Sequence, residues 1–317
     1  MHAIFLDKQT FSAQISITSI QNKVSSLNCY QITPSQKIIE RCKHAAIVIT
    51  NKVILDEKTL AQLPKLKLIC ITATGTNNVD IIAAKKLNIA VTNVSGYAKQ
   101  SVAQYVFAQM LNYFSQVNHH NNNVDKGLWQ KSSTFCYHGN GSEELAGKTL
   151  GLIGYGDLAQ AVEKIAIAFD MTILIAERPK AQQIRKGRLP FLEVIKQADV
   201  LSLHCPQTPD TENLINCDVL QQMKATAMLI NTARGAIINE GDLLAALKSN
   251  TIAYAVLDVL SQEPPTQNNL LLTEQPNNLK ITAHIAWASI EAQQRLINLV
   301  ADNIEDFQLG KLTNRVD

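Results

Sequence analysis

The sequence predicts an α/β protein of two domains, each built on a doubly wound parallel sheet flanked by helices. Its 317 residues suffice for two hydrophobic cores, and the hydrophobic fraction of 46% is that of an ordinary globular protein. Short apolar runs alternate with helical segments along both halves of the chain. In the second half, one apolar run leads directly into a glycine-rich turn.

This turn follows the pattern G-x-G-x-x-A, between a predicted strand at 149–153 and a predicted helix. It comprises Gly154, Tyr155, Gly156, Asp157, Leu158 and Ala159. The first glycine permits a tight turn, the second lets a pyrophosphate approach, and the helix start offers N–H groups to the anion. Because a second buried strand follows at 171–176, we predict a Rossmann-like dinucleotide site.

An acidic residue, Glu177, ends that second strand. It follows Gly156 by about twenty residues, the spacing at which a carboxylate binds the adenosine ribose hydroxyls of NAD. A carboxylate repels the 2'-phosphate of NADP, whereas the neighbouring Arg178 would attract it. We therefore expect NAD(H) as the cofactor, with NADP(H) left open.

The first domain shows the same alternation without a dinucleotide fingerprint of its own. We expect its strands at 3–6, 46–49, 66–72 and 89–94. A polar turn at 72–78, which contains Thr74, Gly75 and Thr76, leaves one strand and enters a helix. Its backbone N–H groups could hold a small carboxylate, although a plain capped connection fits the residues equally well.

A long helix at 101–117 connects the first domain to the second. Residues 119–141 are polar and rich in turn-forming residues, so we expect irregular structure there. His119 and His120 lie in this segment, but no third ligand is near them in the sequence. We therefore expect solvated side chains and no metal site.

The rest of the second domain completes the sheet. Further strands are predicted at 200–203, 227–231, 253–259 and 279–282, with helices near 191–197, 216–223 and 240–248. With the two strands around the glycine turn, this makes the six strands of a complete dinucleotide-binding fold. A last helix at 289–309 lies beyond them and is free to pack on the first domain.

Several polar residues follow these later strands, at the edge where open α/β sheets bind their ligands. They are Arg234, Asp258, Glu263 and His284. Alone, each fits a structural role such as a surface ion pair or a turn cap. Their joint placement at successive strand ends predicts one site near the nicotinamide.

The chemistry of these side chains is complementary. A guanidinium grips a carboxylate with two hydrogen bonds, which suits Arg234 to anchoring a 2-oxo acid. An imidazole exchanges protons near neutral pH, so His284 can supply the proton, and Glu263 can orient the ring. His204 also ends a strand, but it precedes Cys205 and Pro206 in the loop expected along the cofactor, so we assign it a positional role.

Composition excludes several other classes of protein. The 29 basic and 27 acidic residues give a formal net charge of +2, which predicts neither nucleic-acid nor membrane binding. The six cysteines show no metal-binding spacing and fit reduced thiols in the cytoplasm. The sequence contains no apolar run of the length of a membrane span.

Eight segments resemble successive signatures of the D-isomer-specific 2-hydroxyacid dehydrogenases, in particular of the hydroxypyruvate reductase or glycerate dehydrogenase branch. They are TGTNNVD, SVAQYVFAQML, GYGDLAQAVEKIA, ILIAERP, ADVLSLHCPQTPDT, LINTARGAIINE, LDVLSQEPP and TAHIAWAS. The similarity covers nearly the whole chain. It implies a homodimer, a substrate domain built from residues 1–98 and 287–317, and an NAD-binding domain at 99–286.

The resemblance also implies roles for individual residues. Arg234, Glu263 and His284 would form the catalytic set. The substrate would meet Thr74, Gly75 and Thr76, and the cofactor would be contacted by Thr232, Ala233 and Asp258, with Asp258 beside the nicotinamide. Two residues depart from the family pattern: Ala159 replaces a common glycine, and Ala283 replaces the proline that usually precedes the histidine, which predicts a looser loop.

The expected activity is therefore the NADH-dependent reduction of a short 2-oxo acid, such as hydroxypyruvate or glyoxylate, to the D-2-hydroxy acid. Hydride would be added to C2 of the acid, with His284 as the acid and base. The alternative is a non-enzymatic, corepressor-like binding protein of the same fold that senses NADH and dimerises.

Overall fold

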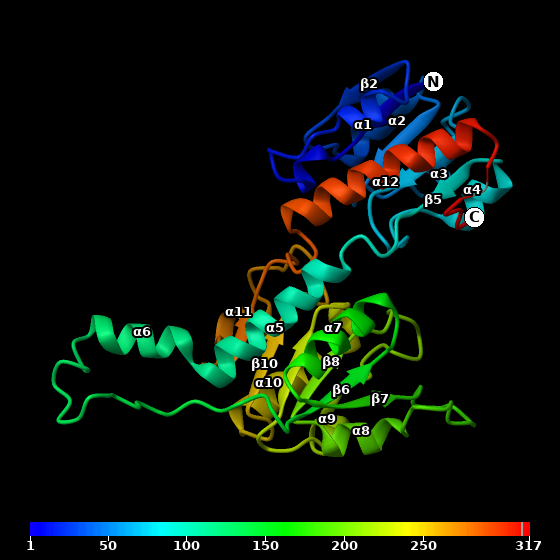
Figure 1. The fold of residues 1–317 in the computed structure, drawn as a ribbon. Coiled ribbons are helices and arrows are strands. Elements are labelled where there is room, and N and C mark those ends of the chain that lie inside the picture. The colour runs from blue at the N-terminus through cyan, green and yellow to red at the C-terminus, as the bar shows by residue number, and fades with distance from the viewer. Residues whose placement is uncertain (312) are drawn as a thin grey trace. The chain divides into compact units, whose positions relative to one another are not determined.

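The computed structural model describes residues 1–311 and 313–317 and divides the chain into two compact units. Unit 1 is built from both ends of the chain, Met1–Ala98 and Trp287–Asp317, and unit 2 from Lys99–Ala286. Each unit contains one parallel sheet with helices around it (Figure 1). The predicted α/β fold with two Rossmann-like sheets is thus confirmed.

The sheet of unit 1 has five parallel strands in the order β2-β1-β3-β4-β5. The strands are β1 (His2–Phe5), β2 (Ser26–Cys29), β3 (Ile47–Thr50), β4 (Leu68–Ile71) and β5 (Ala90–Thr92). The helices are η1 (Lys8–Thr10), α1 (Thr18–Gln21), η2 (Ser35–Lys37), α2 (Ile38–Cys42), α3 (Glu57–Leu60), α4 (Ile81–Lys86) and α12 (Ile290–Gln308). β3, β4 and β5 are buried along their whole length.

Helix α12 returns the end of the chain to unit 1. Ser289 caps its first turn, and a stripe that includes Leu296, Val300 and Ile304 is fully buried. Gln293, also buried, accepts a hydrogen bond from the backbone N–H of Ser12 at 2.8 Å. The predicted last helix therefore forms within one or two residues of its expected bounds and packs on the first domain.

The sheet of unit 2 has six parallel strands in the order β11-β10-β9-β8-β6-β7. The strands are β6 (Thr149–Ile153), β7 (Thr172–Ala176), β8 (Val200–Leu203), β9 (Met228–Asn231), β10 (Tyr254–Leu257) and β11 (Leu279–Ile281). The chain adds β7 on one side of β6 and then returns to add β8 on the other side. The crevice outside the carboxyl ends of β6 and β8 is therefore the expected ligand site.

The helices of unit 2 cover its sheet and extend from it (Figure 1). They are α5 (Lys99–Ser115), α6 (Val117–Asp125), α7 (Asp157–Ala168), α8 (Phe191–Gln197), α9 (Cys217–Leu220), η3 (Gly235–Ile237), α10 (Glu240–Lys248) and α11 (Leu270–Glu274). Phe107 of α5 stacks on Phe169 with ring centroids 5.5 Å apart. No helix of the described residues is long and apolar enough to cross a membrane.

Four elements differ from the sequence prediction. α6 forms within a segment expected to be irregular, and α5 ends earlier because Gln116 adopts a left-handed φ of 49°. β2 was not predicted because it is a mostly exposed edge strand without an apolar run. α11 is a helix of five residues, too short to show helical periodicity.

The buried carboxylate of Asp7 holds the loop that follows β3. It accepts hydrogen bonds from the backbone N–H groups of Asn51, Lys52 and Val53 at 2.7–3.2 Å, and from the hydroxyl of Thr50. One side chain thus serves three backbone donors that the sheet does not pair, of which that of Val53 also donates to the hydroxyl of Thr50 at 3.1 Å.

We expect the substitution Asp7→Ala to lower the free energy of unfolding by about 1–3 kcal/mol, because the buried N–H of Asn51 loses its carboxylate acceptor. Asp7→Asn retains one acceptor oxygen and should cost less. Urea denaturation followed by circular dichroism measures both. Equal stability of Asp7→Ala and the unsubstituted protein would contradict this account of the loop.

Candidate functional site

The first glycine of the turn after β6 is required by its surroundings. Gly154 has a φ of +87°, a conformation that other residues rarely adopt. A Cβ atom at this position would lie only 2.6 Å from the backbone nitrogen of Cys205. The turn therefore passes directly against the loop that follows β8.

The second glycine leaves space where an anion would approach. Gly156 is the N-cap of α7, and a Cβ built on it meets no atom within 4 Å. Asp157 and Leu158 form the first helical positions, where free N–H groups point out of the helix. Ala159 is fully buried, so the helix packs closely at the position where a third glycine is common.

A cavity of about 790 Å³ opens beside this turn. It brings together eight of the residues predicted to bind the cofactor: Gly154, Tyr155, Gly156, Glu177, Arg178, His204, Cys205 and Pro206. Two more, Thr232 and Ala233, follow β9. The buried hydroxyl of Thr232 and the Nδ1 atom of His204 have no hydrogen-bond partner among the described residues, so a bound nucleotide could satisfy polar atoms here.

His204 is suited to a positional role. Burial lowers the pKa of this imidazole to about 4, so the ring is neutral at pH 7. Its Nε2 atom lies 2.9 Å from the hydroxyl of Ser202, which fixes the ring plane. A ring that stays neutral near pH 7 is poorly suited to supplying a proton there.

Glu177 is held by a residue that the sequence analysis did not identify. Arg185 donates two side-chain hydrogen bonds to its carboxylate, at 2.5 and 2.6 Å, and the backbone N–H of Arg178 donates a third. These bonds hold the pKa of the Glu177 carboxyl far below its usual range. The only sequence signal was that Arg185 lies in a basic loop following Glu177.

Arg234 follows β9 on a backbone fixed by its neighbours. The side-chain amide of Asn231 donates to the carbonyl of Arg234 at 2.9 Å and accepts from the N–H of Ala233 at 3.0 Å. A Cβ on Gly235 would fall 1.8 Å from the carbonyl carbon of Leu260, so only glycine fits there. This close approach joins the Arg234 segment to the loop that carries Glu263.

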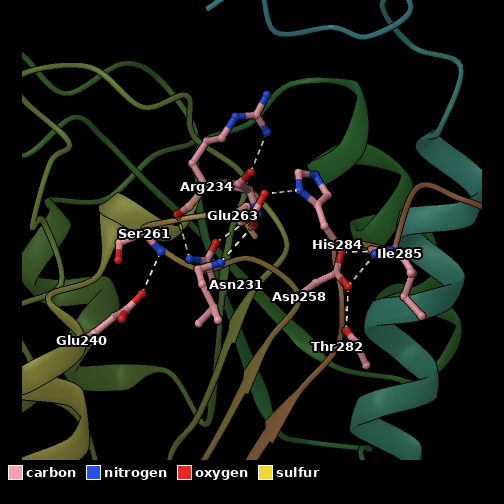
Figure 2. A network of polar contacts seen from close by, with 12 residues as sticks. Asn231, Arg234, Glu240, Asp258, Ser261, Glu263, Thr282, His284 and Ile285 are labelled. Carbon is pink, nitrogen blue, oxygen red and sulfur yellow. Dashed lines mark hydrogen bonds and ion pairs between the residues drawn. The ribbon is translucent and has the colours of Figure 1, made fainter. Parts of the chain in front are cut away.

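The imidazole of His284 points toward Glu263 (Figure 2). Its Nδ1 atom lies 2.6 Å from Glu263 Oε2, and both side chains are partly exposed, at 25% and 32%. The other carboxylate oxygen accepts from the backbone N–H of Leu260, and the next residue, Ser261, donates its N–H to Glu240 at 2.7 Å. The orienting carboxylate is therefore itself held in place.

Asp258 fixes the loop on which His284 lies (Figure 2). Its carboxylate, in a residue 1% exposed, accepts from the hydroxyl of Thr282 at 2.6 Å and from the N–H groups of Ile285 and Ala286 at 2.9 and 2.8 Å. Its backbone carbonyl accepts from the N–H of His284 at 2.8 Å. Four hydrogen bonds to one residue thus set the course of the loop.

The bonds to Asp258 hold the loop although Ala283 stands where a proline is usual. His284 has a φ of +55°, an uncommon conformation for a histidine that surrounding bonds must maintain. Ala283 itself adds no rigidity to the backbone, so the order of the loop comes from Asp258. Tyr105 of α5 extends the network, with its hydroxyl 2.6 Å from that of Thr282.

In unit 1, the turn after β4 is hydrogen-bonded to the segment that follows β5. The hydroxyl of Thr74 donates to the carbonyl of Val94 at 2.9 Å, and the side chain of Asn93 donates to the carbonyl of Thr74 at 2.7 Å. Thr76 accepts a backbone hydrogen bond from Val79. A substrate contact by this turn stays a prediction. No group of three metal-binding side chains occurs among the described residues.

Comparisons with known proteins find relatives along nearly the whole chain. A sequence model of the family described as "D-isomer specific 2-hydroxyacid dehydrogenase, NAD binding domain" matches residues 107–286. The chain is 40% identical to a glycerate dehydrogenase of Methylorubrum extorquens, over 99% of this chain and 98% of the relative. It is 36% identical to a hydroxypyruvate reductase of Blautia hydrogenotrophica, over 90% and 89% of the two chains.

A solved structure shows the same fold over its whole length. It is an acyclic imino acid reductase in complex with NADPH and D-Arg, 28% identical to this chain. The TM-score is 0.86, and the match covers 100% of both chains.

We expect Asp258→Ala to release the loop that carries His284. The amide protons of Ile285 and Ala286 should then exchange with solvent about 10- to 100-fold faster, because each loses a hydrogen bond to a charged acceptor. Hydrogen exchange followed by mass spectrometry or NMR measures this. Thr282→Val, which leaves the bonds of Ile285 and Ala286 to Asp258 in place, is the matched control. Unchanged protection in Asp258→Ala would show that other contacts hold the loop.

Proposed function

Since the chain belongs to the D-isomer-specific 2-hydroxyacid dehydrogenase family and carries that family's NAD-binding domain, we propose that it reduces a short 2-oxo acid to the D-2-hydroxy acid. Substrates of the hydroxypyruvate or glyoxylate type fit best, because relatives that match nearly the whole chain are named glycerate dehydrogenase and hydroxypyruvate reductase. The observation that carries the proposal is the contact of His284 with Glu263 at 2.6 Å.

Arg234 anchors the acid in the proposed reaction. Its guanidinium presents parallel N–H donors that match the two oxygens of a carboxylate, and it would also polarise the carbonyl to be reduced. The side chain already donates to the carbonyl of Ala233 at 2.6 Å, which limits its freedom before substrate binds. Less entropy is then lost when the acid is held.

His284 provides the proton. Glu263 engages Nδ1, so the proton for the reaction is carried on Nε2, the other ring nitrogen. When bound, NADH supplies the hydride to C2 of the acid. His284 donates its proton to the oxygen that becomes negative as C2 is reduced, and the carboxylate of Glu263 orients the ring.

The cofactor is proposed to lie along the carboxyl ends of β6, β7 and β8. The residues from Gly154 to Leu158 would hold the pyrophosphate, and Glu177 with Arg178 would contact the adenosine. His204, Cys205 and Pro206 would line the path toward the nicotinamide. Thr232, Ala233 and Asp258 complete the proposed set, with Asp258 acting chiefly through the loop that it holds.

Unit 1 is proposed to supply the substrate domain and unit 2 the NAD-binding domain. Contacts of Thr74, Gly75 and Thr76 with the acid form part of this proposal. So do assembly as a homodimer and a location in the cytoplasm. Exposed aromatic side chains after α6, such as Phe135 at 91% and Trp129 at 52%, support a surface that associates with a second copy. The alternative of a non-enzymatic NADH sensor is not favoured, since the relatives reported above are named as enzymes.

The first test is an assay of NADH oxidation with hydroxypyruvate, glyoxylate and pyruvate. We expect turnover with at least one of them and a loss of about 10²- to 10³-fold in kcat/KM for Arg234→Ala, because the carboxylate loses a charged partner. Arg234→Lys keeps the charge without the planar fork and should recover part of the loss. The proposal fails if no 2-oxo acid is reduced, or if Arg234→Ala is fully active.

The second test addresses the proton donor. His284→Gln should reduce kcat by about 10²- to 10⁴-fold, the contribution typical of a general acid. NADH binding, followed by the nucleotide's fluorescence, should change little, since the proposed cofactor contacts remain. His44→Gln, at an exposed histidine of unit 1, is the matched control. A kcat that survives in His284→Gln would assign the proton to another group.

A further inference from the structure

The loop around His284 is hydrogen-bonded to the long helix α5. The hydroxyl of Ser101 donates to the carbonyl of Ala286 at 2.7 Å, at the end of the loop. The hydroxyl of Tyr105 lies 2.6 Å from that of Thr282, at the start of the loop. In Figure 2 the helix, drawn in teal, runs beside this loop. The loop is therefore attached to α5 on both sides of its histidine.

The two hydroxyl-bearing residues share one face of α5. Ser101 and Tyr105 are four positions apart, so their side chains lie one turn apart on the same side of the helix. The helix itself is fixed by packing within unit 2, since Val102 and Val106 are buried and Phe107 stacks on a ring that follows α7. Side chains that extend from a well-packed helix are placed more precisely than side chains on loops.

The hydrogen bond between the two hydroxyls has a defined direction. Thr282 has one hydroxyl proton, which it donates to the carboxylate of Asp258 at 2.6 Å. Tyr105 must therefore donate its own proton to the oxygen of Thr282. Burial, and to a smaller extent the charge of Asp258, raises the pKa of this phenol, so it keeps its proton at neutral pH. Two successive hydrogen bonds thus lead from α5 to the buried carboxylate, and each strengthens the other.

Helix α5 binds the groups of the loop that Asp258 cannot bind. A carboxylate only accepts hydrogen bonds, so Asp258 holds two N–H groups and one hydroxyl proton of the loop. The carbonyl of Ala286 and the oxygen of Thr282 need donors, and α5 supplies one to each. Both ends of the loop are fixed in this way, and His284, with its left-handed φ of 55°, lies between them.

We propose that Ser101 and Tyr105 are positioning residues, which hold the loop so that the imidazole of His284 keeps the orientation in which it transfers its proton. The proposal rests on the proposed function, because it takes His284 to be the proton donor. The contact of the ring with Glu263 at 2.6 Å requires a fixed ring direction, and the backbone on either side of His284 sets that direction. Both hydroxyls act through the loop.

The test compares the double variant Ser101→Ala/Tyr105→Phe with Tyr113→Phe, which removes a partly exposed phenolic hydroxyl from the same helix. In the NADH oxidation assay the double variant should lose about 10- to 50-fold in kcat, because two hydrogen bonds that hold the loop are gone. The KM values for NADH and the 2-oxo acid should stay within about twofold, since the proposed contacts with both remain. Tyr113→Phe should keep kcat within about twofold.

A second measurement separates positioning from a general loss of structure. In a His284→Gln background, the double variant should lower kcat by less than a further factor of about two, because no proton donor is left to position. An unchanged kcat in the original background, an equal loss in both backgrounds, or a loss confined to KM would overturn the proposal. If the double variant folds poorly, Tyr105→Phe alone takes its place, with an expected loss of about 3- to 10-fold.

The hold of α5 on the loop can also be measured without turnover. The N–H of His284 donates to the carbonyl of Asp258 at 2.8 Å. Its proton should exchange with solvent about 3- to 10-fold faster in the double variant, and at the original rate in Tyr113→Phe. If the unsubstituted protein reduced no 2-oxo acid, the proposed function would fail, whereas this exchange rate would still show whether α5 holds the loop. Unchanged exchange in the double variant would contradict that hold.

Discussion

A buried carboxylate, that of Asp258, is the constraint on which the arrangement of the catalytic residues depends. A charge at 1% exposure is costly unless it is fully hydrogen-bonded, and here one hydroxyl and two backbone N–H groups satisfy it. All three donors belong to the loop around His284. The loop cannot change course without leaving this charge unsatisfied, so the histidine is held in a left-handed conformation that it would rarely adopt alone.

The rest of the catalytic edge follows from the parallel order of the sheet. β9, β10 and β11 are neighbours, so the segments that leave their carboxyl ends emerge side by side. Arg234, Glu263 and His284 come from these three segments, although they are far apart in the sequence. Gly235 lets the first segment pass against the second, and Glu240 ties the second to α10. Because these segments are already held in place, fewer side chains have to be ordered during the reaction.

Much of this could be predicted from the sequence, because glycine turns and buried parallel strands are local patterns. The strand and helix around Gly154, and the strand that ends near Asp258, could be predicted without knowing how the chain packs. The pairing of Arg185 with Glu177 could not be predicted, since it depends on how an irregular, polar loop folds back on a strand end. The hydrogen bonds between Asp258 and the His284 loop could not be predicted for a similar reason. They join the segments that follow two neighbouring strands, and the spacing of residues in the sequence does not indicate such contacts. α6 was not predicted because its residues are mostly polar and form no apolar stripe.

The central claim is that His284 and Glu263 act as one unit on the same reacting oxygen. A double-mutant cycle on kcat/KM tests it most directly, with His284→Gln, Glu263→Gln and the double variant assayed on one 2-oxo acid. If Glu263 works only by orienting His284, the double variant should lose about as much activity as His284→Gln alone. Losses that multiply in the double variant would show that the two side chains act independently, which would contradict the account.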